Sequence, residues 1–244
     1  MSRLSAVDVR RALPRKGAAP RPARPAGSLT ALVTERIREA IVDGRFALGE
    51  ALSELKLAAA LNVSRTPVRD ALTALQLQGL IDVRPQSGSF VFLPSEEGVA
   101  ELAEFRRVLE VTALRFCFAR RRDEALRAMR AAADAMERAG DAGDRLAVAR
   151  ADTAFHQAIA ENSANEYLIA AYRMVSGRVA ALRTHNLMAT DAIRTKSLAE
   201  HRSVIAAFAK GDLGRAESVL EEHIWRMRLR FQAARGQAGA EPPE

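Results

Sequence analysis

The sequence is poor in cysteine and aromatic residues, and it has no long apolar run. Its only cysteine, Cys117, excludes an internal disulfide framework and suits a reducing compartment. Aromatic residues make up 5% of the 244 residues and hydrophobic residues 48%, so we expect a core of Leu, Ala and Val, which suits helices. The sequence contains no stretch of about 20 apolar residues, so it predicts no transmembrane helix. The N-terminus contains Arg but lacks the apolar segment of a secretory signal. These absences favour a cytoplasmic protein with no membrane partner.

Positive charge is concentrated at the N-terminus. The formal net charge is +7, and residues 1–28 hold seven Lys and Arg against one Asp, hence +6, which leaves +1 for the remaining chain. This segment is rich in Arg, Pro, Ala and Gly and has no period, so we predict a disordered basic arm. Such an arm either adds salt-sensitive affinity for phosphates or is a terminus with no role.

Two short helices around a tight turn are predicted between Ser53 and Ile81. The first has apolar residues at helical spacing: Leu55, Leu57, Ala58, Ala60 and Leu61. Asn62 tolerates the left-handed backbone of a turn, and Ser64 is the expected N-cap of the second helix. The apolar face of the second helix is predicted at Val68, Ala71, Leu72, Leu75 and Leu77. An earlier helix over residues 29–43 has its apolar face at Leu32, Val33, Ile37, Ala40 and Ile41.

The second helix carries polar donors away from its apolar face, at Arg65, Thr66, Arg69 and Thr73. Such a helix can lie in a DNA major groove, where Arg forks onto guanine and hydroxyls reach phosphates. A solvent-exposed face would account for one Arg, but it does not account for donors crowded into the first turn. Residues 81–84 and 89–92 then read as strands, joined by a turn at 85–88. The pattern indicates a helix-turn-helix with a hairpin wing.

This region resembles the N-terminal domain of GntR-family transcriptional regulators. The resemblance lies in ALNVSRTPVRDALTALQLQGLI and in the RPQSGSFV that follows. It implies that five residues face a double-stranded DNA operator: Ser64, Arg65, Thr66, Arg69 and, at the wing tip, Gly88. Many relatives carry an Arg ten residues before the first Arg of the motif. This chain has Leu55 there, so that DNA contact is absent and the operator preference can differ.

After residue 95 the sequence shows no strand-like alternation. Helices are predicted at 96–120, 122–139, 143–162, 165–187, 191–210 and 213–235, with short connections typical of an antiparallel bundle. The predicted fold is therefore mostly α. Its predicted parts are the arm at 1–28, a winged helix-turn-helix domain at 29–94, an all-helical effector-binding and dimerisation domain at 95–235, and a disordered tail at 236–244.

Three histidines and one aspartate stand out in the helical region. Asp152 and His156 are four residues apart and share a helical face, and His201 and His223 lie on later helices. Such a set can bind a borderline divalent metal ion. The alternative is buried histidines that only hydrogen-bond their neighbours. Spacing alone favours this alternative, because neither an HEXXH nor a CxxC motif is present.

The helical region resembles the FCD domain, the all-helical C-terminal domain of FadR-type GntR regulators. Its three metal-bearing segments resemble ADTAFHQAIAENSANEYL, AEHRSVIAAFAKGD and AESVLEEHI, and FRRVLE resembles its first helix. The resemblance implies Asp152, His156, His201 and His223 as ligands of Zn, Ni or Mn. It implies effector contacts for Arg106, which pairs with Glu110 at i,i+4, and for Asn165. His185 matches no ligand position and is expected at the surface or beside a ligand.

The resemblance covers about residues 30–235 and implies a homodimeric transcriptional regulator, most often a repressor. A small carboxylic or hydroxy acid would complete the metal shell, and Arg106 would balance its charge. Palindromic operators favour a two-fold protein, with contact through the helical region. Two alternatives remain. One is a regulator with a purely structural metal and no effector. The other, a metal-dependent enzyme with an appended DNA-binding domain, is disfavoured because no nucleophile or acid/base Glu accompanies the metal set.

Overall fold

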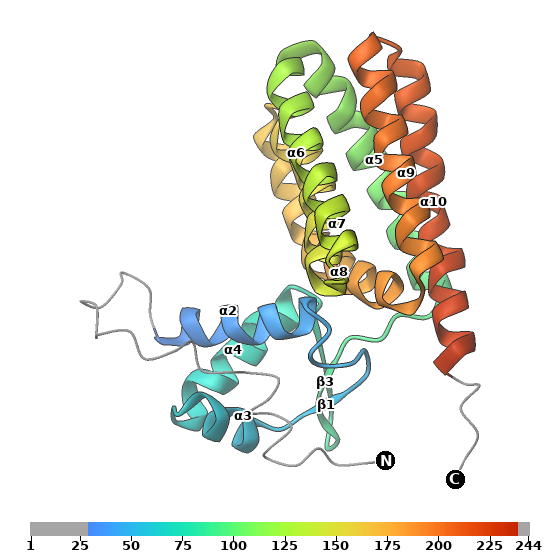
Figure 1. The fold of residues 1–244 in the computed structure, drawn as a ribbon. Coiled ribbons are helices and arrows are strands. Elements are labelled where there is room, and N and C mark those ends of the chain that lie inside the picture. Colours follow the sequence, from blue (N-terminus) through green and yellow to red (C-terminus); the bar gives the residue numbers. More distant parts are fainter. Residues whose placement is uncertain (1–28, 239–244) are drawn as a thin grey trace. The chain divides into compact units, whose positions relative to one another are not determined.

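The computed structural model describes residues 29–238, and its chain divides into two compact units between Leu93 and Pro94 (Figure 1). The predicted basic arm and residues 239–244 lie outside the described residues. The first unit contains α2 (Leu29–Val42), β1 (Ala51–Leu52), α3 (Glu54–Leu61), α4 (Arg65–Leu77), β2 (Ile81–Arg84) and β3 (Gly88–Val91). The second contains α5 (Glu96–Arg120), α6 (Arg122–Asp141), α7 (Arg145–Glu161), α8 (Glu166–Ala189), α9 (Asp191–Lys210) and α10 (Leu213–Ala238).

A left-handed residue separates α3 from α4. Asn62 ends α3 with φ 57° and ψ 48°, as its tolerance of this conformation predicts. Ser64 then precedes α4 with extended backbone but makes no side-chain capping bond, so its hydroxyl remains available. Helix α4 packs against α2 and α3 through buried residues that include Val68, Leu72 and Leu75. The side of α4 that faces away from α2 and α3 therefore carries its polar residues.

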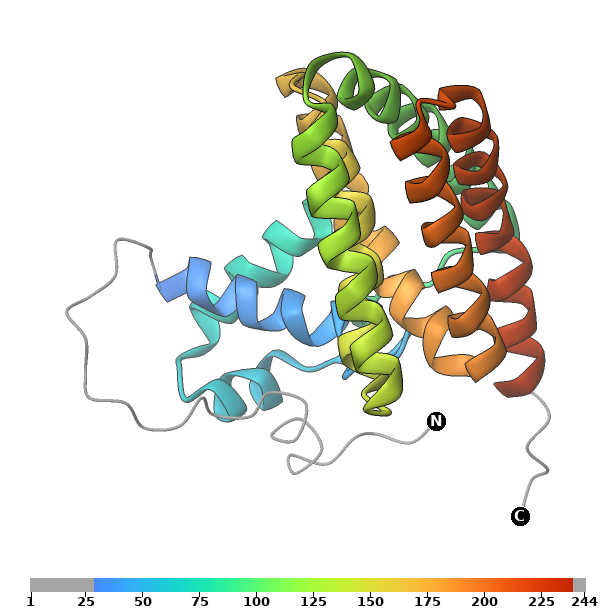
Figure 2. The ribbon, with the colours of Figure 1, turned by 45° about the horizontal axis from the view of Figure 1, so that its top comes forward.

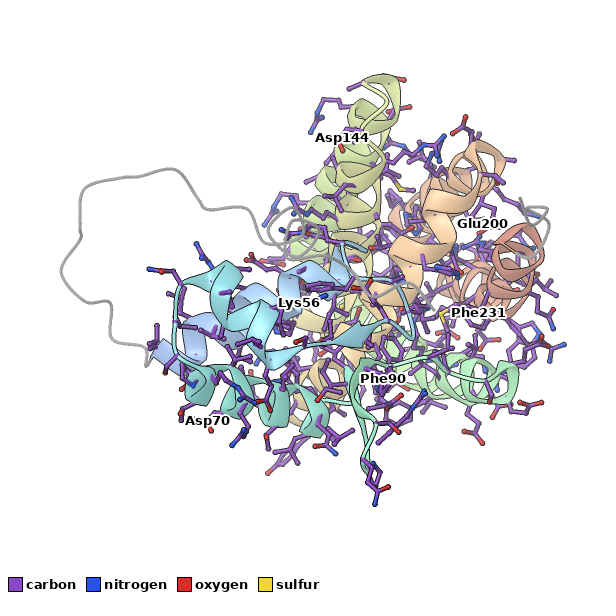
Figure 3. The ribbon with its side chains drawn as sticks, turned by 90° about the horizontal axis from the view of Figure 1, so that it is seen from below. Lys56, Asp70, Phe90, Asp144, Glu200 and Phe231 are labelled. Atoms are coloured by element: carbon purple, nitrogen blue, oxygen red, sulfur yellow. The ribbon has the colours of Figure 1, made fainter. Side chains whose placement is uncertain are left out.

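The strands form an antiparallel sheet in the order β1-β3-β2 within the described residues. Ile81 pairs with Val91 and Arg84 with Gly88, which sets the register of the wing hairpin. Gly88 has φ +108°, a conformation that favours glycine, and an added Cβ would meet no atom within 4 Å. The hairpin extends beyond the helices of its unit (Figure 3). Strand β1 is absent from the sequence prediction because its two residues are too short to show a period.

Three leucines assigned to apolar faces are exposed instead. The exposed fractions are 55% for Leu32, 67% for Leu55 and 87% for Leu77. Each lies at the edge of its helical stripe, where periodicity alone cannot tell a core position from the rim. The predictions for these three residues were wrong.

Helices α5–α10 form the antiparallel bundle that the connections predict (Figures 1 and 2). Polar residues begin several of these helices: Ser95 accepts a hydrogen bond from the Gly98 N–H, and Asp144 one from the Ala147 N–H. Helix α10 continues to Ala238, three residues past the expected end at residue 235. None of the helices within residues 29–238 is long and apolar enough to cross a membrane. The mostly α fold class is confirmed.

Candidate nucleic-acid interface and metal centre

The predicted DNA-facing residues are exposed together at the start of α4 and at the wing tip. Ser64, Arg65, Thr66 and Arg69 lie at or just before the first turns of α4, and all are exposed, as is Gly88. The α4 residues on the opposite side are buried. One outward surface of this unit therefore combines hydroxyl, guanidinium and backbone donors, the groups that contact phosphates and base edges.

Glu54, the first residue of α3, holds both arginines of this surface. Its Oε2 accepts hydrogen bonds from Nη2 of Arg65 at 2.9 Å and from Nη2 of Arg69 at 3.1 Å. Its Oε1 accepts a further bond from Nε of Arg69 at 3.2 Å. The hydrogen bonds from Arg69 and then Arg65 lower the pKa of Glu54. Sequence analysis did not predict this contact, which joins residues 11 and 15 positions apart.

The four predicted metal ligands converge inside the bundle. Asp152 and His156 lie on α7, His201 on α9 and His223 on α10, and all four are buried. One potential ligand atom from each lies within 4.8 Å of the others. Residues up to 71 positions apart in sequence therefore lie close enough together to bind one ion. The four predicted ligands thus surround one point in the interior of the bundle.

Two carboxylates orient two of the histidines. Nδ1 of His156 lies 2.5 Å from Oε2 of Glu110, and Nδ1 of His223 lies 2.6 Å from Oε2 of Glu200. A carboxylate only accepts, so each Nδ1 carries the proton and each Nε2 presents a lone pair. These two Nε2 atoms face each other at 3.1 Å. Two acceptors this close repel one another unless a cation lies between them, and this tautomer is the one that metal-binding histidines adopt.

His201 supplies a further sign of a missing partner. Both of its ring nitrogens are buried and make no hydrogen bond in the described part of the chain. Its ring stacks on Phe155 with a centroid distance of 3.8 Å, and Nε2 points toward Asp152 at 3.5 Å from Oδ1. An unsatisfied buried polar atom costs about 1–3 kcal/mol. A bound cation would remove that cost by accepting the Nε2 lone pair.

The pKa shifts of the four residues leave their ligand atoms in the protonation states that bind a cation. Burial lowers the pKa of His201 to about 3 and lowers the pKa of His156 and of His223, so the rings are neutral near pH 7. Burial alone would raise the pKa of Asp152, but its interactions with the nearby His201 ring and with the Arg183 guanidinium lower it instead, so Asp152 is an anion. Three neutral imidazoles and one carboxylate are a donor set that fits Zn, Ni or Mn.

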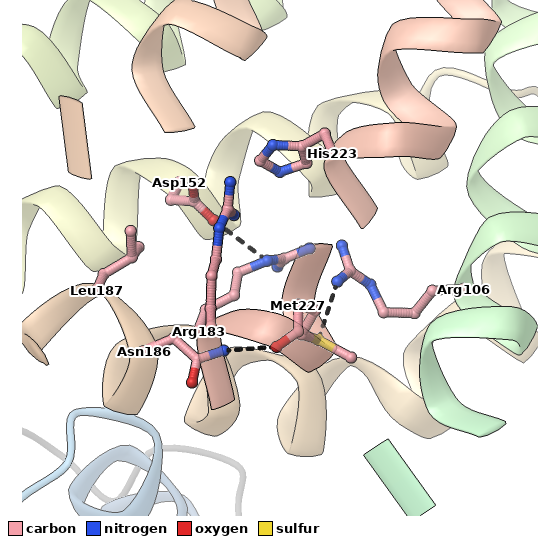
Figure 4. A pocket seen from close by; sticks show the side chains of 8 residues that line it. Arg106, Asp152, Arg183, Asn186, Leu187, His223 and Met227 are labelled. Atoms are coloured by element: carbon pink, nitrogen blue, oxygen red, sulfur yellow. Dashed lines mark hydrogen bonds and ion pairs between the residues drawn. The ribbon is translucent and has the colours of Figure 1, made fainter. Parts of the chain in front are cut away.

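A small cavity of about 20 Å³ adjoins the cluster (Figure 4). Three arginines line it, and each has an acidic partner. Nε of Arg106 donates to Glu110 at 2.8 Å, and Nη2 of Arg230 donates to Glu200 at 2.7 Å. Arg183 lies with its Nε 3.2 Å from Oδ2 of Asp152 and its Nη2 3.7 Å from Oε1 of Glu110. Its Nη1 and Nη2 atoms are buried and make no hydrogen bond in the described residues. These two Nη atoms have hydrogens left to donate to an anion, and the sequence did not predict this residue. An arginine inside the apolar segment VAALRTHNLM was the available signal.

Two other predicted residues lie away from this cavity. Asn165 caps α8, where its Oδ1 accepts the Leu168 N–H at 3.1 Å, and it does not line the cavity. Asn186 lines the cavity instead, and its Nδ2 donates to the Met227 carbonyl at 3.4 Å. His185 is half-buried with its ring near Phe231, outside the four-residue cluster. The structure therefore brings Arg106 to the metal cluster but gives Asn165 a helix-capping position.

The chain matches two known protein families and several named relatives. Residues 29–91 match the gntR family of bacterial regulatory proteins, and residues 101–226 match the FCD domain. A protein of Paenarthrobacter nicotinovorans named as a D-xylose utilization operon transcriptional repressor is 31% identical over 197 residues, covering 79% of this chain and 85% of that protein. The chain belongs to the gntR family of bacterial regulatory proteins. It is therefore a transcriptional regulator and not an enzyme.

Other gntR proteins share both sequence and architecture with this chain. The Uxu operon transcriptional regulator of Escherichia coli strain K12 is 27% identical, covering 80% of this chain and 83% of that protein. The crystal structure of a GntR transcriptional regulator from Rhodococcus sp. RHA1 has a TM-score of 0.73 and 29% identity, covering 88% of this chain and all of the other. These similarities span both units of the chain. They identify the DNA-binding domain and the family of the helical domain, but they name no metal ion or effector for this chain.

Proposed function

We propose that this gntR regulator is a cytoplasmic repressor whose affinity for its operator is modulated by a small carboxylic or hydroxy acid bound beside a divalent metal ion. The repressor assignment is supported by a relative whose name is that of a transcriptional repressor. Ser64, Arg65, Thr66, Arg69 and Gly88 would contact DNA. The observation that carries the sensory part is the meeting of Asp152, His156, His201 and His223 next to buried arginines.

The metal would be held by three histidines and one aspartate. When bound, it would supply positive charge that attracts an oxygen anion from a small acid. Arg183 would donate to that anion with its Nη atoms, which make no hydrogen bond in the described residues, and Arg106 would add charge as another residue that lines the cavity. Glu110 and Glu200 would keep the ligating nitrogens of His156 and His223 aimed at the ion.

A homodimer is proposed because one recognition helix reads only half of a palindromic operator. Helices α5 and α10 pack against each other and both carry large exposed apolar side chains: Phe105, Val108, Trp225 and Leu229. A groove of about 320 Å³ beside them is lined by Glu104, Arg107, Glu221, Glu222 and Trp225. Since this lining carries both signs of charge, a second copy related by two-fold symmetry can pair Arg107 with the partner's acidic side chains.

One observation favours a second candidate function, a regulator with a purely structural metal and no effector. The cavity of about 20 Å³ has room for about one water molecule, so a metabolite would have to displace side chains to enter. This candidate predicts identical DNA binding with and without small acids.

A thermal-shift screen of small carboxylic and hydroxy acids, with and without divalent metals, separates these functions. We expect an acid that raises the melting temperature only in the presence of metal and weakens DNA binding. Arg106→Ala should lose the shift caused by the acid while keeping the shift caused by the metal. The retained metal shift shows that the bundle is still folded. If no acid in the screen shifts the loaded protein, the effector role fails.

A further inference from the structure

The two arginines at the proposed DNA surface share one carboxylate. Glu54 accepts two hydrogen bonds from Arg69 and one from Arg65, over distances of 2.9–3.2 Å. The side chain of Glu54 is 26% exposed, whereas those of Arg65 and Arg69 are 58% and 64% exposed. The carboxylate therefore lies behind the guanidinium groups, which remain accessible from outside. Without it, two like charges at i,i+4 on α4 would repel each other.

The hydrogen-bonding geometry leaves both arginines able to bind bases. A guanidinium has five N–H donors in a planar fork. Arg69 gives Glu54 its Nε–H and one Nη2–H, so both hydrogens of Nη1 and the second of Nη2 remain free of Glu54. Arg65 gives Glu54 only one Nη2–H. The free edge of each fork is the arrangement that pairs with O6 and N7 of guanine.

We propose that Glu54 is a positioning residue that fixes Arg65 and Arg69 for base recognition and so determines operator specificity. Arginine side chains lose rotamer freedom when they form a bidentate contact, and Glu54 removes much of that freedom before DNA arrives. A phosphate accepts an arginine from many directions, whereas a base edge accepts it from one. Holding the forks still therefore favours base contacts over phosphate contacts. This inference rests on the proposed contact of both arginines with DNA.

Asp70 provides a matched comparison on the same surface. It follows Arg69 in sequence and is exposed, but no hydrogen bond joins it to Arg65 or Arg69 in the described part of the chain. Glu54→Gln and Asp70→Asn each replace one carboxylate by its amide and change the charge equally. Only the first variant alters the group that holds both guanidinium forks. A difference between the variants therefore reports positioning and not net charge.

The experiment uses the full chain and synthetic duplexes. Selection from a pool of random duplex DNA with the wild-type protein yields a preferred sequence. Fluorescence anisotropy at one salt concentration then measures the Kd of each variant for that duplex and for a random duplex. We expect Glu54→Gln to reduce the ratio of random to preferred Kd roughly fivefold to a hundredfold, the range for one bidentate base contact. Asp70→Asn should shift both Kd values together and leave the ratio unchanged.

A double-mutant cycle tests whether Glu54 acts on sequence preference through Arg69. Arg69→Ala should lower the ratio by itself, and adding Glu54→Gln to it should change the ratio much less than in the wild type. If Glu54→Gln behaves like Asp70→Asn, Glu54 acts only as a charge and the proposal is overturned. A lower ratio in Glu54→Gln with additive effects in the cycle also overturns it. If the wild type selects no preferred sequence, the proposed recognition of an operator fails. If the wild type has a preference that Glu54→Gln does not alter, only the role of Glu54 fails.

Discussion

At the scale of single residues, one arrangement recurs in both units of the chain: a carboxylate holds a nitrogen-bearing side chain in place. Glu54 holds two exposed arginines, while Glu110 and Glu200 each hold a histidine inside the bundle. In each case the held group keeps a second edge that is not used by the carboxylate. The free edges are donors at the proposed DNA surface and lone pairs at the proposed metal site, which suits an anionic partner in one place and a cation in the other.

Removing one imidazole should abolish metal binding. His201→Ala deletes a ligand from the middle of the cluster, so we expect the purified variant to contain little divalent metal after dialysis, as measured by elemental analysis. His185→Ala is the control, because it removes the histidine that lies outside the cluster. Stoichiometric metal in His201→Ala would refute the assignment of this ligand.

Removing either arginine of the DNA surface should weaken operator binding. Arg65→Ala and Arg69→Ala should each cost roughly 1–3 kcal/mol if the arginine pairs with guanine. Arg127→Ala is a suitable control, because Arg127 is an exposed arginine on α6 whose nearest acidic partner, Glu124, is 3.9 Å away. Anisotropy titrations with the selected duplex measure the loss. Unchanged affinity in both variants, with folding intact, would place the recognition surface elsewhere.

The residues that the sequence predicted are those with short-range signals. Ser64, Arg65 and Arg69 belong to an unbroken motif, and Asp152 with His156 to one helical face. Glu54, Glu200 and Arg183 were missed because their partners lie on other helices, and a single sequence does not show which charges meet across a bundle. Glu110 was expected to pair with Arg106 four residues away, and it does, but its contact with His156 depends on the packing of α5 against α7.

At the scale of elements, helical periodicity located the helices well because each has a long buried stripe and short connections. It failed at the edges of those stripes, where Leu32, Leu55 and Leu77 are exposed. The bundle also buries several polar and charged side chains among its apolar ones. Its helices α7, α9 and α10 each contribute a neutral histidine to a shared interior site. From this interior we predict that the bundle is sensitive to acid.

We expect the metal-free protein to lose stability as the pH falls below about 6.5. The pKa of His201 is lowered to about 3 and the pKa values of His156 and His223 are lowered too, against 6.5 for an unburied histidine. Between these values the unfolded chain binds protons that the folded chain does not. The free energy of unfolding therefore falls with decreasing pH, by up to about 1.4 kcal/mol per pH unit for each histidine.

Urea unfolding followed by far-UV circular dichroism at pH 7 and pH 5 measures this effect, and the midpoint should be lower at pH 5. His201→Asn removes one of the buried titrating groups, so its stability should change less steeply with pH. Equal midpoints for the wild type at the two pH values would show that the buried histidines do not control the acid stability of the bundle.

At the scale of the whole molecule, recognition of a palindromic operator would require two copies of the chain. A second copy would cover the apolar side chains of α5 and α10. We expect the wild type to be a dimer in light scattering, and Trp225→Glu or Val108→Glu to shift it toward monomer, because each would bury a charge at the interface. Met174→Glu is the control on α8, where Met174 is 74% exposed. Dissociation by the α8 variant alone would move the interface to that helix.

The narrowness of the cavity beside the histidines has a consequence for timing. The cavity has room for about one water molecule, so a small acid could enter only if the helices that line it, among them α8 and α10, move apart. The observed rate of uptake would then level off at high acid concentration, at the rate at which the helices part.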